Sequence, residues 1–114
     1  MNKMTFLKLW DWYQALLTPT QREITDAYFN KDLTLSEIAE NKGISRQAVS
    51  ECLSTCKKQL AEYEQKLGRL KIFEEGEALK VKARTWASEF ALSHPECEND
   101  VKELCDILSE GEQE

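Results

Sequence analysis

Residues 34–54 read TLSEIAENKGISRQAVSECLS, and this stretch decides the fold. Thr34 followed by Glu37 is a capping-box pattern, in which the hydroxyl accepts from the N3 amide and the carboxylate accepts from the cap amide. Gly43 stands where the chain leaves the first helix in a left-handed conformation, which costs other residues more. Ser45 is a good N-cap for a second helix. The spacing therefore predicts two short helices joined by a tight turn, a helix-turn-helix.

The apolar residues of the same stretch are spaced so that these two helices pack together. Ala39 is small where the second helix crosses the first, and the side chain of Ile44 is expected to plug the turn. The second helix is expected to bury Val49 with either Cys52 or Leu53, because these positions share one helical face. A generic helical hairpin is the alternative, since any tight helical corner uses parts of this pattern.

Size and composition indicate one small folded domain, with or without an appendage. The chain has 114 residues, of which 41% are hydrophobic, enough to form a core. No apolar run approaches the ~20 residues of a membrane span. The start does not resemble a secretory signal, because Asp11 interrupts its hydrophobic stretch. We therefore expect a cytoplasmic protein without membrane insertion, whose four cysteines are reduced thiols.

The net charge of −6 is unevenly distributed along the chain. Residues 1–30 are balanced, residues 31–71 carry eight basic and six acidic groups, and residues 72–114 carry four and twelve. The segment that would meet a polyanion is thus mildly basic, which matters because phosphate neutralisation supplies most non-specific affinity for nucleic acid. The acidic last third acts either in solvation or in binding a partner.

Every strong periodic signal is helical, so the sequence predicts an all-α protein. The first helix is expected from about Lys3 to Leu17, and the capping pattern of Thr18 with Gln21 opens the next. After the helix-turn-helix, apolar residues repeat at alternating spacings of four and three as far as Leu70, a heptad seam. This seam predicts one helix over residues 46–75, although Gly68 is the place where it would break.

The C-terminal third has apolar stripes but no evident core of its own. A fifth helix is expected after Gly76 and a sixth segment around Leu104. We expect a helix-turn-helix domain at residues 1–60 and a helical acidic extension at 61–114 that forms a homodimer, with an intramolecular bundle as the alternative. The dimer interface is predicted to contain Leu60, Tyr63, Leu67, Leu70, Phe73, Leu79, Trp86 and Phe90.

The sequence offers no positive sign of an enzyme, a cofactor or a metal site. His94 is the single histidine, and the four glycines form neither a Walker loop nor a dinucleotide fingerprint. Cys52 and Cys56 with Cys97 or His94 are a conceivable zinc set, but their spacing is not that of a zinc knuckle. Packed thiols are the preferred interpretation.

The second helix of the pair carries side chains suited to reading bases. If it enters a major groove, Arg46 suits guanine, Gln47 suits adenine, and Ser50 serves either. Glu51 accepts from cytosine but is awkward beside phosphate. Further candidates for contacts with nucleic acid are Ser36, Ser54, Lys57 and Lys58. The alternative for each is an ordinary exposed helix side chain.

From Leu17 to Leu60 the chain resembles region 4 of bacterial sigma factors. The resemblance is carried by a Leu-Thr-Pro opening, by Leu-Ser-Glu-Ile-Ala, and by Gly-Ile-Ser-Arg-Gln-Ala-Val. In that family the corresponding helix reads promoter bases. The resemblance implies the same role for Ser45, Arg46, Gln47, Ser50 and Glu51.

The chain more closely resembles the YlxM family of small helix-turn-helix proteins. This resemblance covers LWDWYQALLT near the N-terminus, the helix-turn-helix, and the extension LAEYEQKLGRL to about Phe73. It implies a regulatory DNA-binding protein linked to the signal recognition particle pathway through the particle RNA and GTPase. The alternative is a protein–protein interaction adaptor with no nucleic-acid binding.

Overall fold

The computed structural model describes residues 1–110, which contain helices and no strand. The predicted all-α fold is confirmed. The chain divides into two compact units, one formed by Met1–Lys71 and one that begins at Ile72. The sequence placed this boundary near residue 60, but Leu70 still belongs to the core of the first unit. None of the helices in residues 1–110 is both long enough and apolar enough to span a membrane.

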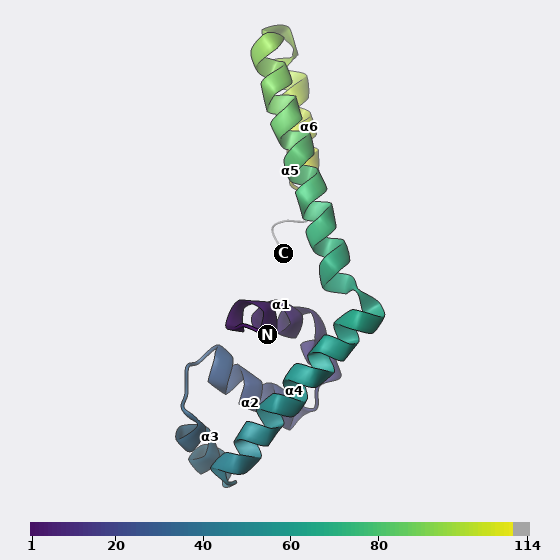
Figure 1. Ribbon diagram of the computed structural model, residues 1–114. Coiled ribbons are helices and arrows are strands. Elements are labelled where there is room, and N and C mark those ends of the chain that lie inside the picture. Colours follow the sequence, from purple (N-terminus) through teal and green to yellow (C-terminus); the bar gives the residue numbers. More distant parts are fainter. Residues whose placement is uncertain (111–114) are drawn as a thin grey trace. The chain divides into compact units, whose positions relative to one another are not determined.

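The first unit is built around its last helix (Figure 1). Its elements are α1 (Lys3–Tyr13), the 3₁₀ turn η1 (Gln14–Leu16), α2 (Pro19–Phe29), α3 (Leu35–Lys42) and α4 (Arg46–Leu67). The helix α4 contacts α1, α2 and α3, and α2 also contacts α3. The first three helices therefore hold one face of α4 in a fixed orientation.

The helix boundaries follow the predicted caps. Thr18 accepts from the Gln21 amide, and the Gln21 side chain accepts from the Thr18 amide, so both halves of the box form. The same reciprocal pair forms between Thr34 and Glu37. The first helix is shorter than predicted, because the chain tightens into 3₁₀ geometry after Tyr13.

The core of the first unit is aromatic and aliphatic. The Phe6 ring from α1 stacks on the Phe29 ring from α2, with centroids 3.9 Å apart. Val49, Cys56 and Leu60 of α4 are fully buried against them. The predicted seam of α4 is thus covered by its own chain over most of its length.

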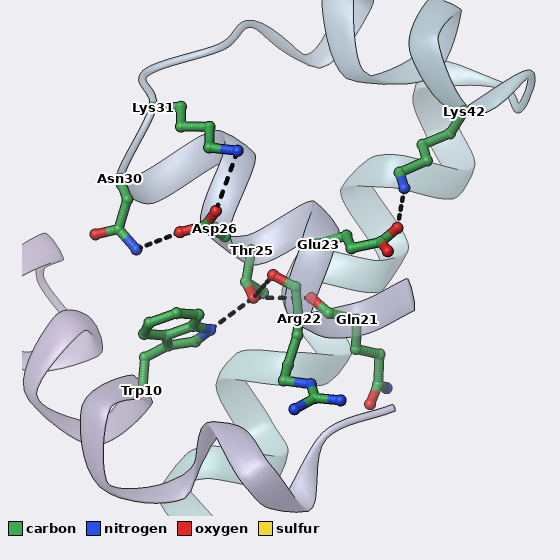
Figure 2. A network of polar contacts seen from close by, with 9 residues as sticks. All are labelled: Trp10, Gln21, Arg22, Glu23, Thr25, Asp26, Asn30, Lys31 and Lys42. Atoms are coloured by element: carbon green, nitrogen blue, oxygen red, sulfur yellow. Dashed lines mark hydrogen bonds and ion pairs between the residues drawn. The ribbon is translucent and has the colours of Figure 1, made fainter. Parts of the chain in front are cut away.

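Polar contacts connect the helices of this unit (Figure 2). Thr25 is fully buried, and its hydroxyl accepts from the Trp10 indole N–H at 2.8 Å. The same hydroxyl lies 2.8 Å from the Gln21 carbonyl, so it donates back to its own helix. On the opposite side of α2, two residues before Thr25, the Glu23 carboxylate pairs with the Lys42 ammonium of α3. These contacts fix α1 and α3 relative to α2.

The long helix predicted over residues 46–75 is interrupted. Gly68 ends α4 in the left-handed conformation, with φ of 61°. The next helix, α5 (Arg69–Ser93), begins at once because Glu64 accepts from the backbone amides of Leu70 and Lys71. The expectation of a fifth helix starting after Gly76 is therefore wrong.

The second unit contains most of α5, the 3₁₀ turn η2 (Pro95–Cys97) and α6 (Glu98–Leu108). The chain reverses direction between α5 and α6 (Figure 1). Within residues 72–110, Ala87 is the one buried residue. This agrees with the expectation that the C-terminal third lacks a large core of its own.

Candidate nucleic-acid interface

The corner before α4 has the predicted backbone geometry. Gly43 lies in the left-handed region with φ of 66°, and its amide donates to the carbonyls of Ala39 and Glu40. The Ser45 hydroxyl accepts from the Ala48 amide at 3.0 Å and caps α4. A helix-turn-helix geometry therefore presents the N-terminal turns of α4 on a defined corner.

The structure corrects one prediction for this corner and decides between two alternatives for another residue of it. The Ile44 side chain is 40% exposed, so it does not plug the turn; instead the Ile44 amide closes it by donating to Ala39 at 3.0 Å. Of the two alternatives for the second buried position, Leu53 is buried and Cys52 is half-buried. Ala39 is buried at the helix crossing, as predicted.

The solvent-facing side of α4 carries polar residues in two adjacent rows. The outer row contains Gln47, Glu51, Ser54 and Lys58, all exposed and spaced by four, three and four residues. Arg46, Ser50 and Lys57 form the neighbouring row, with Arg46 exposed and the other two half-buried. Since residues at these spacings share a helical face, the predicted reading residues lie on one continuous surface.

The tip of this surface combines a free cation with a bonded amide. Within residues 1–110, the Arg46 side chain makes no hydrogen bond or ion pair, so its guanidinium is available to a ligand. The Gln47 side-chain N–H donates to Glu51 at 3.2 Å. Glu51 thus occupies one donor of Gln47 and places a negative charge beside the site.

The lysines of α4 differ in their freedom. The Lys57 ammonium lies 5.6 Å from the centroid of the Phe29 ring, a cation–π contact that holds it against α2. Lys58 is exposed on the outer row. Ser36 is exposed in the first turn of α3, where helix amides favour an anion. Lys58 and Ser36 are consequently the more accessible candidates for phosphate.

A pocket beside Lys57 was not anticipated from the sequence. It has a volume of about 550 Å³ and also involves Lys3, Tyr28 and Asp32. Lys3 pairs with Asp32 at 3.1 Å, and Asp32 has a positive φ of 55°. These residues come from separate elements, so no local pattern in the sequence could indicate that they meet.

The residues predicted for a dimer interface fall into two groups. The structure corrects the prediction for Leu60 and Leu70, because both are buried in the core of the first unit and are not available to a second chain. Tyr63 is half-buried and packs against the same core. The other predicted interface residues are more accessible. Four are exposed and Phe90 is half-buried; the exposed ones are Leu67, Phe73, Leu79 and Trp86.

The cysteines are free thiols, and two of them lie on α4. Burial, followed by the influence of Cys52, raises the pKa of Cys56 to about 12, so this thiol stays protonated. Within residues 1–110 no group of three His, Cys, Asp or Glu side chains is placed to hold a metal ion.

Comparison with known proteins agrees with this geometry. Residues 1–99 match the model of the UPF0122 family, described as "Putative helix-turn-helix protein, YlxM / p13 like". The chain belongs to this family. UPF0122 proteins of Bacillus cereus (strain AH187) and Bacillus anthracis (strain A0248) are each 43% identical to it over 81 residues, covering 71% of this chain and 74% of the relative. The resemblance to YlxM proteins and the helix-turn-helix are therefore confirmed.

Proposed function

We propose that this UPF0122 protein is a non-catalytic regulator that binds nucleic acid through the exposed face of α4. The observation that carries the proposal is the orientation of Arg46. Its helix has the opposite face buried against α1, α2 and α3, while the Arg46 guanidinium is exposed and unpaired within residues 1–110. A rigid helix with a free arginine at its N-terminal turn is the geometry that helix-turn-helix proteins use in a major groove.

The polar rows assign different roles to the residues of this surface. Arg46 suits the O6 and N7 atoms of guanine, and Gln47 suits adenine. Lys58 lies about 18 Å further along the helix than Arg46, at ~1.5 Å per residue, and suits the phosphate backbone. The Ser36 hydroxyl and the first amides of α3 supply a second phosphate contact. Base reading is thus concentrated in the first two turns of α4.

The resemblance to YlxM proteins, which are linked to the signal recognition particle pathway, makes the particle RNA the first RNA to test against duplex DNA. The two ligands make different demands on the surface. The major groove of an RNA helix is too deep and narrow for side chains to read, so α4 would contact RNA through phosphates or through unpaired bases. Gln47→Ala should therefore weaken binding to a preferred DNA sequence but leave binding to the paired regions of RNA nearly unchanged.

A protein-docking role is the second candidate, and Glu51 is the observation that favours it. Its carboxylate lies in the middle of the outer row, where it repels phosphate. In this case the same face would bind a protein, such as the GTPase of the particle, without nucleic acid. The two candidates differ in how strongly added salt weakens binding.

A salt titration separates the two functions. If Lys57 and Lys58 each neutralise a phosphate of duplex DNA, the logarithm of affinity falls against the logarithm of salt with a slope of about −2. Lys58→Ala should reduce that slope by about one. Lys66→Ala is the matched control, because it removes one exposed cation from the last turn of the same helix. A shallow slope that is insensitive to Lys58→Ala would favour protein docking instead.

A further inference from the structure

The second unit exposes a straight row of apolar side chains along α5. Ile72, Leu79 and Trp86 follow one another at intervals of seven residues, and they are 59%, 68% and 64% exposed. Residues seven apart lie almost on one line of a helix. Gly76 lies four residues after Ile72, and Ala83 lies four residues after Leu79. Both are small and let another helix approach closely. The surface is shaped to receive a helix.

The end of this row is ordered before any partner binds. The Trp86 ring stacks on the Phe90 ring with centroids 5.2 Å apart and an interplanar angle of 16°. Phe90 in turn stacks on His94, at 4.1 Å. Because the rings are already held in place, little side-chain freedom remains to be lost on association.

The charges around the row indicate which partner fits it. Over residues 72–86 there are three acidic groups followed by three basic groups, so this part of α5 is balanced. The acidic excess of the second unit comes later in the chain. Glu77 already pairs with Lys80 within the chain, at 3.3 Å. A basic partner protein would gain little from a balanced surface, whereas a second copy in the reverse direction would place Glu75 beside Lys82.

We propose that α5 pairs with α5 of a second copy in an antiparallel, two-fold arrangement centred next to Leu79. Glu75 and Lys82 are both exposed, lie seven residues apart, and border the same side of the apolar row. In the antiparallel register, Glu75 of one copy faces Lys82 of the other, and two-fold symmetry repeats the pair. Parallel pairing in register would instead place Glu75 level with Glu75 of the other copy, and Lys82 level with Lys82. The charges therefore favour the antiparallel direction.

This pairing is independent of the nucleic-acid proposal and has its own consequence. Each dimer carries two helix-turn-helix units, one on each chain. It keeps Leu79 and Trp86 from the interface predicted from the sequence, but not Leu60 and Leu70, which are buried within the first unit.

Two charge reversals and their mixture test the pairing in the full-length chain. Glu75→Lys alone faces Lys82 with a like charge, and Lys82→Glu alone faces Glu75 with a like charge, so each variant should dimerise about tenfold or more weakly than the wild type. When the two variants are mixed, both facing pairs become attractive, and a heterodimer should form. Sedimentation velocity and native mass spectrometry measure these species, and circular dichroism checks that helicity is retained.

A second pair of variants tests the apolar row. Leu79→Lys should abolish dimerisation, whereas Leu92→Lys should not, although Leu92 is more exposed at 84% and lies off the row. A wild-type chain that stays monomeric at hundreds of micromolar would overturn the proposal and leave the row to another protein. A wild-type dimer that is unaffected by Leu79→Lys, or a variant mixture that gives no heterodimer, would overturn it equally.

Discussion

The Tyr13 hydroxyl donates to the Glu64 carboxylate at 2.6 Å, and this contact organises the junction between α4 and α5. The same hydroxyl accepts from the Arg69 amide at 3.0 Å. The Glu64 carboxylate also accepts from the amides of Leu70, at 3.1 Å, and Lys71, at 3.0 Å. One phenol and one carboxylate thus satisfy three amides in the first turn of α5, and they connect that turn to α1.

Removing the Tyr13 hydroxyl should destabilise the first unit. Tyr13→Phe leaves the Arg69 amide without its acceptor and the Glu64 carboxylate with one donor fewer. We expect a loss of about 1–2 kcal/mol in the free energy of unfolding, measured by urea denaturation. Tyr63→Phe is the matched control, because within residues 1–110 the Tyr63 hydroxyl makes a single, long hydrogen bond of 3.5 Å to the Leu16 carbonyl. Equal losses in both variants would contradict the role given to Tyr13.

The pH dependence of stability should report on Glu64. Burial by itself raises the pKa of Glu64, but the hydrogen bonds from Tyr13, Leu70 and Lys71 outweigh it and hold the pKa below its ordinary value of 4.5. Because the folded-state pKa is the lower one, the carboxylate stabilises the fold fully above the unfolded-state pKa. That stabilisation is lost as the pH falls through the folded-state pKa.

Glu64→Gln should therefore be less stable than the wild type near neutral pH, and the difference should shrink in acid. Urea denaturation at a series of pH values measures it. Glu62→Gln removes the same charge from an exposed position of α4 and serves as the control. A wild-type advantage over Glu64→Gln that stays constant down to acid pH would exclude the proposed linkage.

The buried Thr25 hydroxyl should matter more than the volume of its side chain. Thr25→Val keeps the shape but leaves the Trp10 indole N–H without its acceptor. This should cost about 1–3 kcal/mol in the free energy of unfolding. Thr25→Ser retains the hydroxyl and should lose less, although it removes a buried methyl group. Thermal unfolding followed by tryptophan fluorescence compares the two, and a more stable valine variant would refute the prediction.

Removing the Glu51 charge should strengthen nucleic-acid binding. The Glu51 carboxylate accepts from Gln47 and repels phosphate. Glu51→Gln is therefore expected to tighten non-specific DNA binding several-fold at low salt, by an amount that decreases as salt is added. Fluorescence anisotropy with a labelled duplex measures the change. Weaker binding by this variant would show that Glu51 itself contacts the ligand, as expected for recognition of cytosine N4.

Much of the first unit could be predicted because its signals are local. The boxes at Thr18 and Thr34, and the left-handed Gly43, each depend on residues within one or two helical turns, where stereochemistry alone restricts the choices. The exposure of Arg46 and Gln47 followed from the apolar spacing of the same helix. These features form as predicted in the structure.

The junction after α4 could be predicted only in part, because the sequence marked Gly68 as the place of a break but not the contacts that form there. The heptad seam continues through Leu67 and Leu70, so periodicity alone favours an unbroken helix. The break is completed by Tyr13, which lies 51 positions from Glu64 in the sequence. The pocket that joins Lys3 to Asp32 likewise depends on a contact across 29 positions. Such contacts exist only after the helices pack, and no local pattern indicates them.

The central claim is that the N-terminal turns of α4 bind nucleic acid, and the double variant Arg46→Ala with Gln47→Ala tests it most directly. The wild type, the double variant and Lys66→Ala are compared at one fixed salt concentration. The quantity measured is their affinity for duplex DNA and for the RNA of the signal recognition particle. We predict that the double variant loses about tenfold or more in affinity for its ligand with unchanged helicity, while Lys66→Ala binds nearly as the wild type does. A double variant that binds both nucleic acids as tightly as the wild type would contradict the account.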